Sequence, residues 1–219
     1  MGKEINLMVN YPKTKRDTSS RLENKTEEDK QIAKQYGIDF FDGDRKYGYG
    51  GFSYNAKYWE NVIQTFKQHY NLTKNSKILD IGCAKGFMLY DFQRLIPGID
   101  VQGIDISSYA IENSKVEVKP FLRVGDAIKL PYEDNSFDLV ISITTLHNLN
   151  KKDMILALKE IDRVSKKDSF ITLDAYRNED EKKAMEAWNL TALTMMHTKE
   201  WKSFFEEIGY KGDYYWFVP

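Results

Sequence analysis

From residue 77 onward, short apolar runs alternate with stretches of helical periodicity, and this alternation restricts the possible folds more than any other feature. The run 137–143 has too little polar alternation for a strand with one face in water. Such strands, separated by helices, are typical of parallel sheets covered on both faces. The predicted strands are 77–81, 101–106, 121–124, 137–143, 169–174 and 214–218. The sequence therefore predicts an α/β fold with a mainly parallel sheet.

The helices expected between these strands have recognisable ends. We predict a helix over 87–96, one capped by Ser107 that runs to residue 113, one capped by Asn150 that reaches residue 164, one over 178–187, and one capped by Thr198 and closed by Gly209. Residues 188–196 are compatible with either a strand or a helix extension.

The chain before residue 57 has a different character, and we assign 1–56 to an N-terminal arm and lid and 57–219 to the main domain. Thr26 and Asp29 form a capping-box pattern for a short helix that we expect to end at Gly37. Residues 36–59 hold nine aromatic side chains in 24 positions, interspersed with glycines. This pattern favours a structured loop that covers a crevice and walls the substrate site, and the alternative is simple packing on the sheet. An amphipathic helix is predicted over 57–70.

Composition excludes several classes of protein. Lys and Arg number 32 and Asp and Glu 33, so the net charge of −1 argues against a long basic groove for nucleic acid. A single cysteine excludes an intramolecular disulfide framework, and no Cys/His cluster suits structural zinc, so we expect no metal. There is no secretory h-region and no apolar run of membrane-spanning length. We expect a cytoplasmic protein without membrane association, and a homodimer is possible.

The sharpest local signal is the turn D-I-G-C-A-K-G at 80–86, which leaves the first strand and enters a helix. Its G-x-x-x-G spacing differs from the G-x-G-x-x-G of dinucleotide sites. Asp80 would repel a pyrophosphate but attract an amine. Asp105 ends the second strand, where a carboxylate can bind both ribose hydroxyls, and Asp126 follows the third strand, where it can accept from an adenine amine. The three carboxylates together describe S-adenosylmethionine, a ligand with an ammonium group, a ribose and a base but no phosphate.

The stretches ILDIGCAKG (78–86), VQGIDIS (101–107) and VGDAIKLPYEDNSFDLVIS (124–142), followed by ITTLHNL, resemble the class I S-adenosylmethionine-dependent methyltransferases. The resemblance covers residues 57–175 well and implies a Rossmann-like, seven-stranded sheet. It implies cofactor contacts from the glycine loop, from the ends of the second and third strands, and from the end of the fourth: Asp80, Gly82, Cys83, Ala84, Gly86, Asp105, Ile106, Gly125, Asp126, Ala127 and Ile143. Lys85 departs from the small or polar residue of many members, and we expect it to extend into solvent.

Several further residues are candidates for chemistry beyond the cofactor. His147 follows the fourth strand, where it could take a proton from a substrate hydroxyl or simply hydrogen-bond the loop. A nucleophilic role for Cys83 is disfavoured, because no base lies near it in sequence. We expect substrate contacts from lid tyrosines and from residues after the fourth and fifth strands: Tyr47, Tyr49, Tyr54, Asn148 and Arg177.

These observations predict methyl transfer to a small polar metabolite. A looser resemblance of YGYGGFSYN and GDYYWFV to small bacterial methyltransferases of surface-glycan or nucleotide-sugar biosynthesis suggests a nucleotide-activated sugar, methylated on oxygen or nitrogen. Two alternatives stay open. One is a methyltransferase for RNA or protein, and the other is a cofactor-binding regulatory or assembly subunit that transfers nothing.

Overall fold

The computed structural model describes residues 2–13, 18, 21, 25–50 and 53–218. Its centre is a seven-stranded sheet in the order β3-β2-β1-β4-β5-β6, with β7 also paired to β5, and every strand pair is parallel. The strands are β1 (Lys77–Ile81), β2 (Asp100–Asp105), β3 (Leu122–Val124), β4 (Phe137–Ile143), β5 (Ser165–Tyr176), β6 (Met196–His197) and β7 (Asp213–Phe217). The expected parallel α/β sheet is confirmed, and β5 is longer than predicted at both ends.

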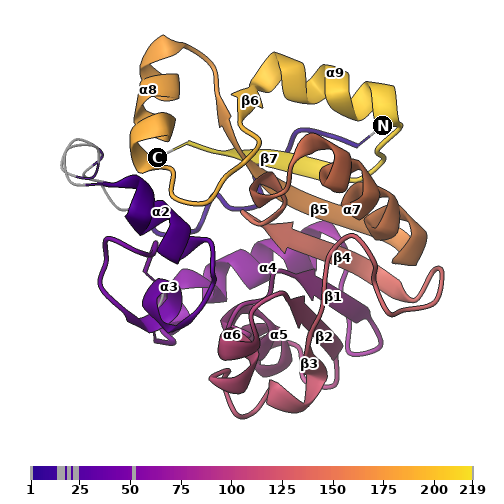
Figure 1. Cartoon of the computed structure of the whole chain (residues 1–219). Coiled ribbons are helices and arrows are strands. Elements are labelled where there is room, and N and C mark those ends of the chain that lie inside the picture. Colours follow the sequence, from indigo (N-terminus) through magenta and orange to yellow (C-terminus); the bar gives the residue numbers. More distant parts are fainter. Residues whose placement is uncertain (1, 14–17, 19–20, 22–24, 51–52, 219) are drawn as a thin grey trace.

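Helices cover both faces of the sheet (Figure 1). They are α4 (Glu60–His69), α5 (Phe87–Leu95), α6 (Ser108–Glu112), α7 (Lys151–Val164), α8 (Glu179–Trp188) and α9 (Thr198–Ile208), with short turns η1 (Ala56–Tyr58), η2 (Lys119–Phe121) and η3 (Leu146–Asn148). Alternate strand residues feed two cores. Ile78 packs with α4 and α5 on one face, while Leu79 packs with α7 and α9 on the other. Burial on both faces explains why the strands read as continuous apolar runs.

The N-terminal part adds two short helices, α2 (Glu27–Ala33) and α3 (Ile38–Asp42). Thr26 and Asp29 form the predicted capping box. The expected end at Gly37 is wrong, because α2 stops at Ala33 and Tyr36 takes a left-handed φ of 49°. Gly37 instead precedes α3 as its N-cap residue. Of the predicted aromatic segment, residues 51–52 lie outside the described part of the chain.

Two further expectations near the C-terminal end need correction. Residues 189–195 form an irregular connection that is neither a helix extension nor a long strand. The N-cap residue of α9 is His197 rather than Thr198, because His197 Nδ1 accepts the Lys199 backbone N–H at 3.0 Å. The Glu200 carboxylate accepts the His197 backbone N–H in return. Gly209 closes the helix as predicted, with a φ of 72°.

The first residues of the chain lie along the outer edge of β7. The backbone of Ile5 donates to Tyr214, and Tyr214 donates to Lys3. From there the chain leads across the carboxyl end of the sheet, so N-terminal residues reach the same edge as the ends of β1, β2 and β4. Within the described residues, no helix is both long and apolar enough to cross a membrane.

Candidate active site

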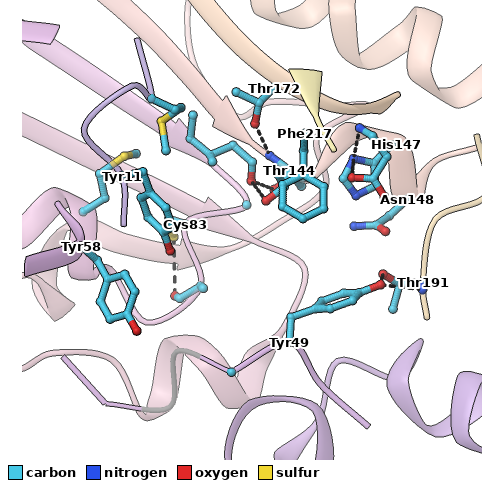
Figure 2. Close-up of a pocket in the computed structure, with 18 of the residues that line it drawn as sticks. Tyr11, Tyr49, Tyr58, Cys83, Thr144, His147, Asn148, Thr172, Thr191 and Phe217 are labelled. Atoms are coloured by element: carbon cyan, nitrogen blue, oxygen red, sulfur yellow. Dashed lines mark hydrogen bonds and ion pairs between the residues drawn. The ribbon is translucent and has the colours of Figure 1, made fainter. Parts of the chain in front are cut away.

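A cavity of about 1650 Å³ lies at the carboxyl ends of the parallel strands. Ligands of open parallel sheets bind at this edge, because the strand-to-helix turns gather there. The cavity is walled by the turn after β1, by the ends of β2, β4 and β5, by β7, and by described residues before α4, such as Tyr11, Tyr36 and Tyr49. Figure 2 shows side chains from these distant segments facing one another across it.

The turn after β1 is shaped by glycine at one position. Gly82 has a φ of 79°, and a Cβ there would lie only 2.1 Å from Thr145 Oγ1. The backbone N–H groups of Gly82 and Cys83 both donate to Ile104 O, which holds the turn against β2. Gly86 does not line the cavity. A Cβ on it would meet Val118 and Leu122 side chains, so its glycine serves packing.

Asp80 is the penultimate residue of β1, beneath this turn, and is 4% exposed. Burial, with the nearby Asp105 carboxylate as the second cause, raises its pKa to about 8. None of the described residues donates a hydrogen bond to its carboxylate or forms an ion pair with it. An unpartnered buried carboxylate that lines a cavity is a fitting counter-charge for an ammonium group.

Asp105 ends β2, and backbone donors fix its carboxylate. Oδ2 accepts the Ala84 N–H at 2.7 Å, and Oδ1 accepts the Ser107 N–H at 2.9 Å. Burial raises its pKa although these two hydrogen bonds oppose the rise. Each oxygen keeps a lone pair for another donor, as a ribose diol requires. Ile106, next in the chain, is 56% exposed and lines the cavity.

The turn after β3 supplies the third predicted carboxylate. Gly125 N–H donates to Asp105 O, which joins the two turns, and Asp126 Oδ1 accepts the Ile128 N–H at 3.1 Å. A Cβ on Gly125 would lie 2.5 Å from Ile104 Cδ1. Asp126, Ala127 and Ile143 all line the cavity.

These features pass a structural test for S-adenosylmethionine. The Gly82 turn leaves room that a Cβ would fill, Asp80 has no partner among the described residues, and Asp105 has free acceptor capacity. The described residues contain no group of three or more His, Cys, Asp or Glu side chains that could hold a metal. Burial raises the pKa of the Cys83 thiol well above its usual value, which opposes nucleophilic chemistry there.

His147 lies in η3 and is 4% exposed. Its Nδ1 accepts the Asp174 backbone N–H at 3.1 Å. A backbone N–H can only donate, so Nδ1 must be unprotonated to accept it. The proton of the neutral imidazole is therefore on Nε2. Burial lowers the His147 pKa to about 3, so the ring is neutral at ordinary pH. In this state Nε2 is a donor, which differs from the expected proton acceptor.

The predicted substrate residues divide into two groups. Tyr49, Asn148 and Arg177 line the cavity, whereas Tyr47 and Tyr54 do not. The Tyr54 hydroxyl donates to Asp91 at 2.6 Å on α5, and its ring packs on Phe87 and Tyr90. The Tyr47 ring lies against the Lys46 ammonium. The glycines around these tyrosines indicated a lid but not which rings turn inward.

Asn148 and Tyr49 face the same part of the cavity (Figure 2). The buried Asn148 Oδ1 accepts no hydrogen bond from the described residues. The Tyr49 hydroxyl accepts the Leu190 N–H at 2.7 Å, which fixes the lid to the loop before β6. The Arg177 side chain contacts Glu181 through Nε and Nη2, so its charge is already compensated.

Sequence reasoning missed several cavity residues because they come from remote segments. Tyr11 packs on Tyr58 at a centroid distance of 5.5 Å, and Phe217 and Thr144 line the same cavity (Figure 2). Thr144 has a φ of 50°, a strained conformation for a β-branched residue. Thr144 directly follows the predicted contact Ile143, whereas no local pattern places Tyr11 or Phe217 at the cavity.

Arg21 is another cavity residue that the sequence did not indicate. Its guanidinium lies 4.3 Å from the Trp188 ring centre and donates to Gly48 O, Arg45 O and Trp188 O. It has no carboxylate partner among the residues that the structure describes.

Comparison with known proteins supports the family resemblance. A family model described as a methyltransferase domain matches residues 72–215. A demethylmenaquinone methyltransferase of Symbiobacterium thermophilum is 32% identical over 103 residues, which cover 43% of this chain and 41% of the relative. The same-named protein of Staphylococcus aureus strain JH9 is 34% identical over 95 residues, which cover 36% and 39%. The matches thus span about two fifths of the length of these relatives.

The fold is likewise found among solved structures. The crystal structure of the protein MccD superposes with a TM-score of 0.54 and 26% sequence identity, covering 68% of this chain and 69% of that one.

Proposed function

This chain belongs to the class I S-adenosylmethionine-dependent methyltransferase family, and from that premise we propose that it methylates a small, negatively charged polar metabolite. The observation that carries the proposal is the meeting of Asp80, Asp105 and Asp126 around the Gly82 turn in one cavity. Such a set suits an amino acid, a ribose and a base, and disfavours a pyrophosphate. S-Adenosylmethionine, the methyl donor of the family, supplies an activated methyl group on a sulfonium.

The residues of this chain would hold that donor as follows. We assign Asp80 to its ammonium group, Asp105 to the ribose hydroxyls and Asp126 to the adenine amine. The turn from Gly82 to Ala84 would lie along the methionine part, with Ile106, Ala127 and Ile143 against the apolar surfaces. The lid in residues 1–56 would exclude water and align the acceptor with the methyl group.

The remaining part of the cavity suggests the class of acceptor. Tyr49 and Trp188 provide flat aromatic surfaces, and Arg21 provides a cation without a carboxylate partner in the described chain. A guanidinium group that is not neutralised by a carboxylate can bind a phosphate through its N–H groups. Our specific proposal is a nucleotide-activated sugar. Arg21 supports it better than Arg177, whose charge Glu181 compensates.

His147 and Asn148 suggest how a polar acceptor is oriented. His147 Nε2–H is a donor, and Asn148 Oδ1 is an acceptor without a partner among the described residues. A hydroxyl or amine can accept from the first and donate to the second. We propose that His147 contacts the acceptor as a donor. A neutral amine needs no base to attack, and for a hydroxyl the Asp174 carboxylate in the same cavity is the candidate base.

The test is a methyl-transfer assay on the purified chain. The protein is incubated with S-adenosylmethionine and one acceptor at a time: nucleotide sugars, free sugars, and demethylmenaquinone, which the name of the curated relatives contains. The proposal predicts S-adenosylhomocysteine and a methylated product with a nucleotide sugar. Methylation of demethylmenaquinone alone would replace the acceptor class, and binding without any turnover would favour the regulatory role.

A further inference from the structure

Lys85 departs from expectation in a way that connects the lid to the cofactor turn. The sequence suggested a side chain in solvent, but Lys85 is only 6% exposed. Its ammonium donates to both carboxylate oxygens of Asp42, at 2.5 and 2.6 Å. Lys85 lies within the glycine turn, and Asp42 is the last residue of α3. The ion pair therefore joins two segments that are 43 residues apart in sequence.

Other hydrogen bonds join the same two regions. The Tyr109 hydroxyl of α6 donates to Asp42 Oδ2 at 2.7 Å. The Ser107 hydroxyl donates to Tyr36 O, just before α3, at 2.5 Å. Ser107 is also a backbone donor to Asp105. The segment 36–42 is thus fastened to both turns that carry the proposed methionine and ribose contacts.

The anchorage of α3 is otherwise weak. The helix has five residues and none of them is buried. Its apolar contacts are ring pairs, such as Phe41 stacked on Tyr109 at 6.5 Å. Burial alone would raise the pKa of Asp42, but Lys85 and Tyr109 hold it below its ordinary value. A segment with so little buried apolar surface opens easily unless polar contacts hold it.

We propose that Asp42 and Lys85 form a latch that holds the segment 36–42 over the cofactor cavity and opens for each exchange of S-adenosylmethionine for S-adenosylhomocysteine. Tyr36, Phe40 and Phe41 line the cavity, so this segment covers the proposed ribose end when the latch is closed. The same lid carries Tyr49 of the acceptor side. Closing the latch over the bound cofactor brings Tyr49 into the acceptor side of the cavity. The cofactor therefore enters before the acceptor binds. Asp42 and Lys85 are positioning residues in this scheme, which rests on the proposed function for the identity of the ligand.

The experiment measures release of S-adenosylhomocysteine from wild type and Asp42→Asn by stopped-flow fluorescence. We expect Asp42→Asn to release the ligand about tenfold faster, because a charge-assisted contact on the lid is lost. Asp42→Glu, which keeps the charge, should restore much of the slow release. Tyr109→Phe should lie between wild type and Asp42→Asn. The matched control is Asp44→Asn, since the Asp44 carboxylate accepts the Lys46 N–H within its own turn.

A second readout needs no ligand. Amide hydrogen exchange of residues 38–42 in the ligand-free protein should quicken in Asp42→Asn and stay unchanged in Asp44→Asn. Equal release rates and equal exchange in the two variants would overturn the latch while leaving the proposed function intact. If wild type does not bind S-adenosylhomocysteine at all, the proposed function and the gating of its cofactor both fail.

Discussion

At the scale of single residues, Gly82 and Gly209 form a natural comparison. Both have left-handed φ values, 79° and 72°, but a Cβ on Gly82 would collide with Thr145, whereas nothing lies within 4 Å of one on Gly209. We expect Gly209→Ala to cost only the backbone strain, about 1 kcal/mol. Gly82→Ala should cost more and also abolish cofactor binding. Urea unfolding and calorimetry with S-adenosylhomocysteine measure the two effects, and normal ligand affinity in Gly82→Ala would contradict the assigned turn.

Removing the charge of Asp80 should have opposite effects on the stability of the chain and on its binding of cofactor. Its pKa is about 8 in the folded chain, against an ordinary 3.8, so the folded state holds the proton more tightly. The stability of the ligand-free protein should therefore fall as pH rises from about 4 to about 8. Asp80→Asn should remove this loss and be more stable than wild type at pH 8.5 by about 1–3 kcal/mol.

The same substitution removes the counter-charge proposed for the ammonium group. Asp80→Asn should thus bind S-adenosylhomocysteine at least tenfold more weakly while unfolding at higher urea concentration. Urea unfolding at pH 6 and 8.5, with calorimetry on the same samples, tests both halves. A variant that is less stable than wild type at pH 8.5 would show that Asp80 has a partner in the folded protein.

His147 makes a prediction about pH profiles. Because burial lowers its pKa to about 3, its ring should stay neutral across an assay range of pH 5–9. Stability linked to this group is present above the ordinary pKa of 6.5 and is lost as pH falls from there towards 3. The kcat profile should show no inflection near 6.5 from His147.

The donor role also ranks the substitutions. His147→Gln, which keeps an N–H donor, should retain roughly tenfold more activity than His147→Ala. An inflection near pH 6.5 that disappears in His147→Gln would restore the general-base role. The surface residue His69, which faces Asp213 at the opposite edge of the sheet, is the control site.

At the scale of elements, the N-terminal arm is fastened to the end of α8. The Lys25 ammonium donates to Glu186 O, Ala187 O and Asn189 O at 2.7–3.0 Å. These carbonyls lack helical partners at a helix C-terminus, where a cation is favourable. Figure 1 shows α2 close to this end of α8. The arm is therefore held by side-chain charges bonded to backbone oxygens 161–164 residues away.

Lys25→Met should loosen this attachment. We expect a loss of about 1–3 kcal/mol, since one charged donor serves three carbonyls. Hydrogen exchange should quicken in the last turn of α8 and in α2. Lys34→Met is the matched control, since the Lys34 side chain on the same arm bonds none of the described residues. Equal exchange in the two variants would mean that other contacts hold the arm.

Element boundaries show what the sequence could and could not predict. Strands such as 77–81 and 137–143 were predictable because burial on both faces leaves an apolar run, and the caps at Ser107 and Asn150 have local signals. The end of α2 was not predictable. A left-handed φ at a helix end is expected of a glycine such as Gly37, but here Tyr36 adopts it. The irregular path of 189–195 depends on contacts with Tyr49 and His147, which no local pattern contains.

The candidate site was predictable to the same extent. Asp80, Gly82, Asp105 and Asp126 follow directly from strand ends, and the structure brings them together. Arg21, Tyr11 and Phe217 reach the cavity only through tertiary folding, so their positions in sequence say nothing of it. Gly86 and Tyr54 have local settings that suggested ligand contact, but neither lines the cavity. Gly86 allows close packing of Leu122, and the Tyr54 hydroxyl donates to Asp91.

At the scale of the whole molecule, the cavity joins segments from both ends of the chain. Tyr11 from the arm, Tyr49 from the lid and Phe217 from β7 surround the turns that carry the carboxylates (Figure 2). A ligand in this cavity would therefore tie the arm, the lid and the sheet into one cooperative unit, so binding should raise the unfolding temperature of the entire chain.

That coupling gives a test of ligand class. At 100 times its Kd, a ligand that binds only the folded state adds about 2.7 kcal/mol of stability. For a chain of 219 residues this corresponds to a rise in Tm of roughly 5–10 °C. S-Adenosylhomocysteine should produce this rise. At pH 8.5, where Asp80 is mostly ionised, NAD at the same concentration should change the Tm by less than about 1 °C. The Asp80 charge then opposes a pyrophosphate, and the turn lacks the dinucleotide glycine spacing.

Asp105→Asn provides the matched comparison for this measurement. It keeps the size of the side chain and one acceptor oxygen for the Ala84 or Ser107 N–H, but replaces the second acceptor with a donor amide. Its unfolding temperature should respond to S-adenosylhomocysteine far less than that of wild type. A rise with NAD equal to that with S-adenosylhomocysteine would mean that the three carboxylates do not select against phosphate, and the choice of cofactor would have to be made on other groups in the cavity.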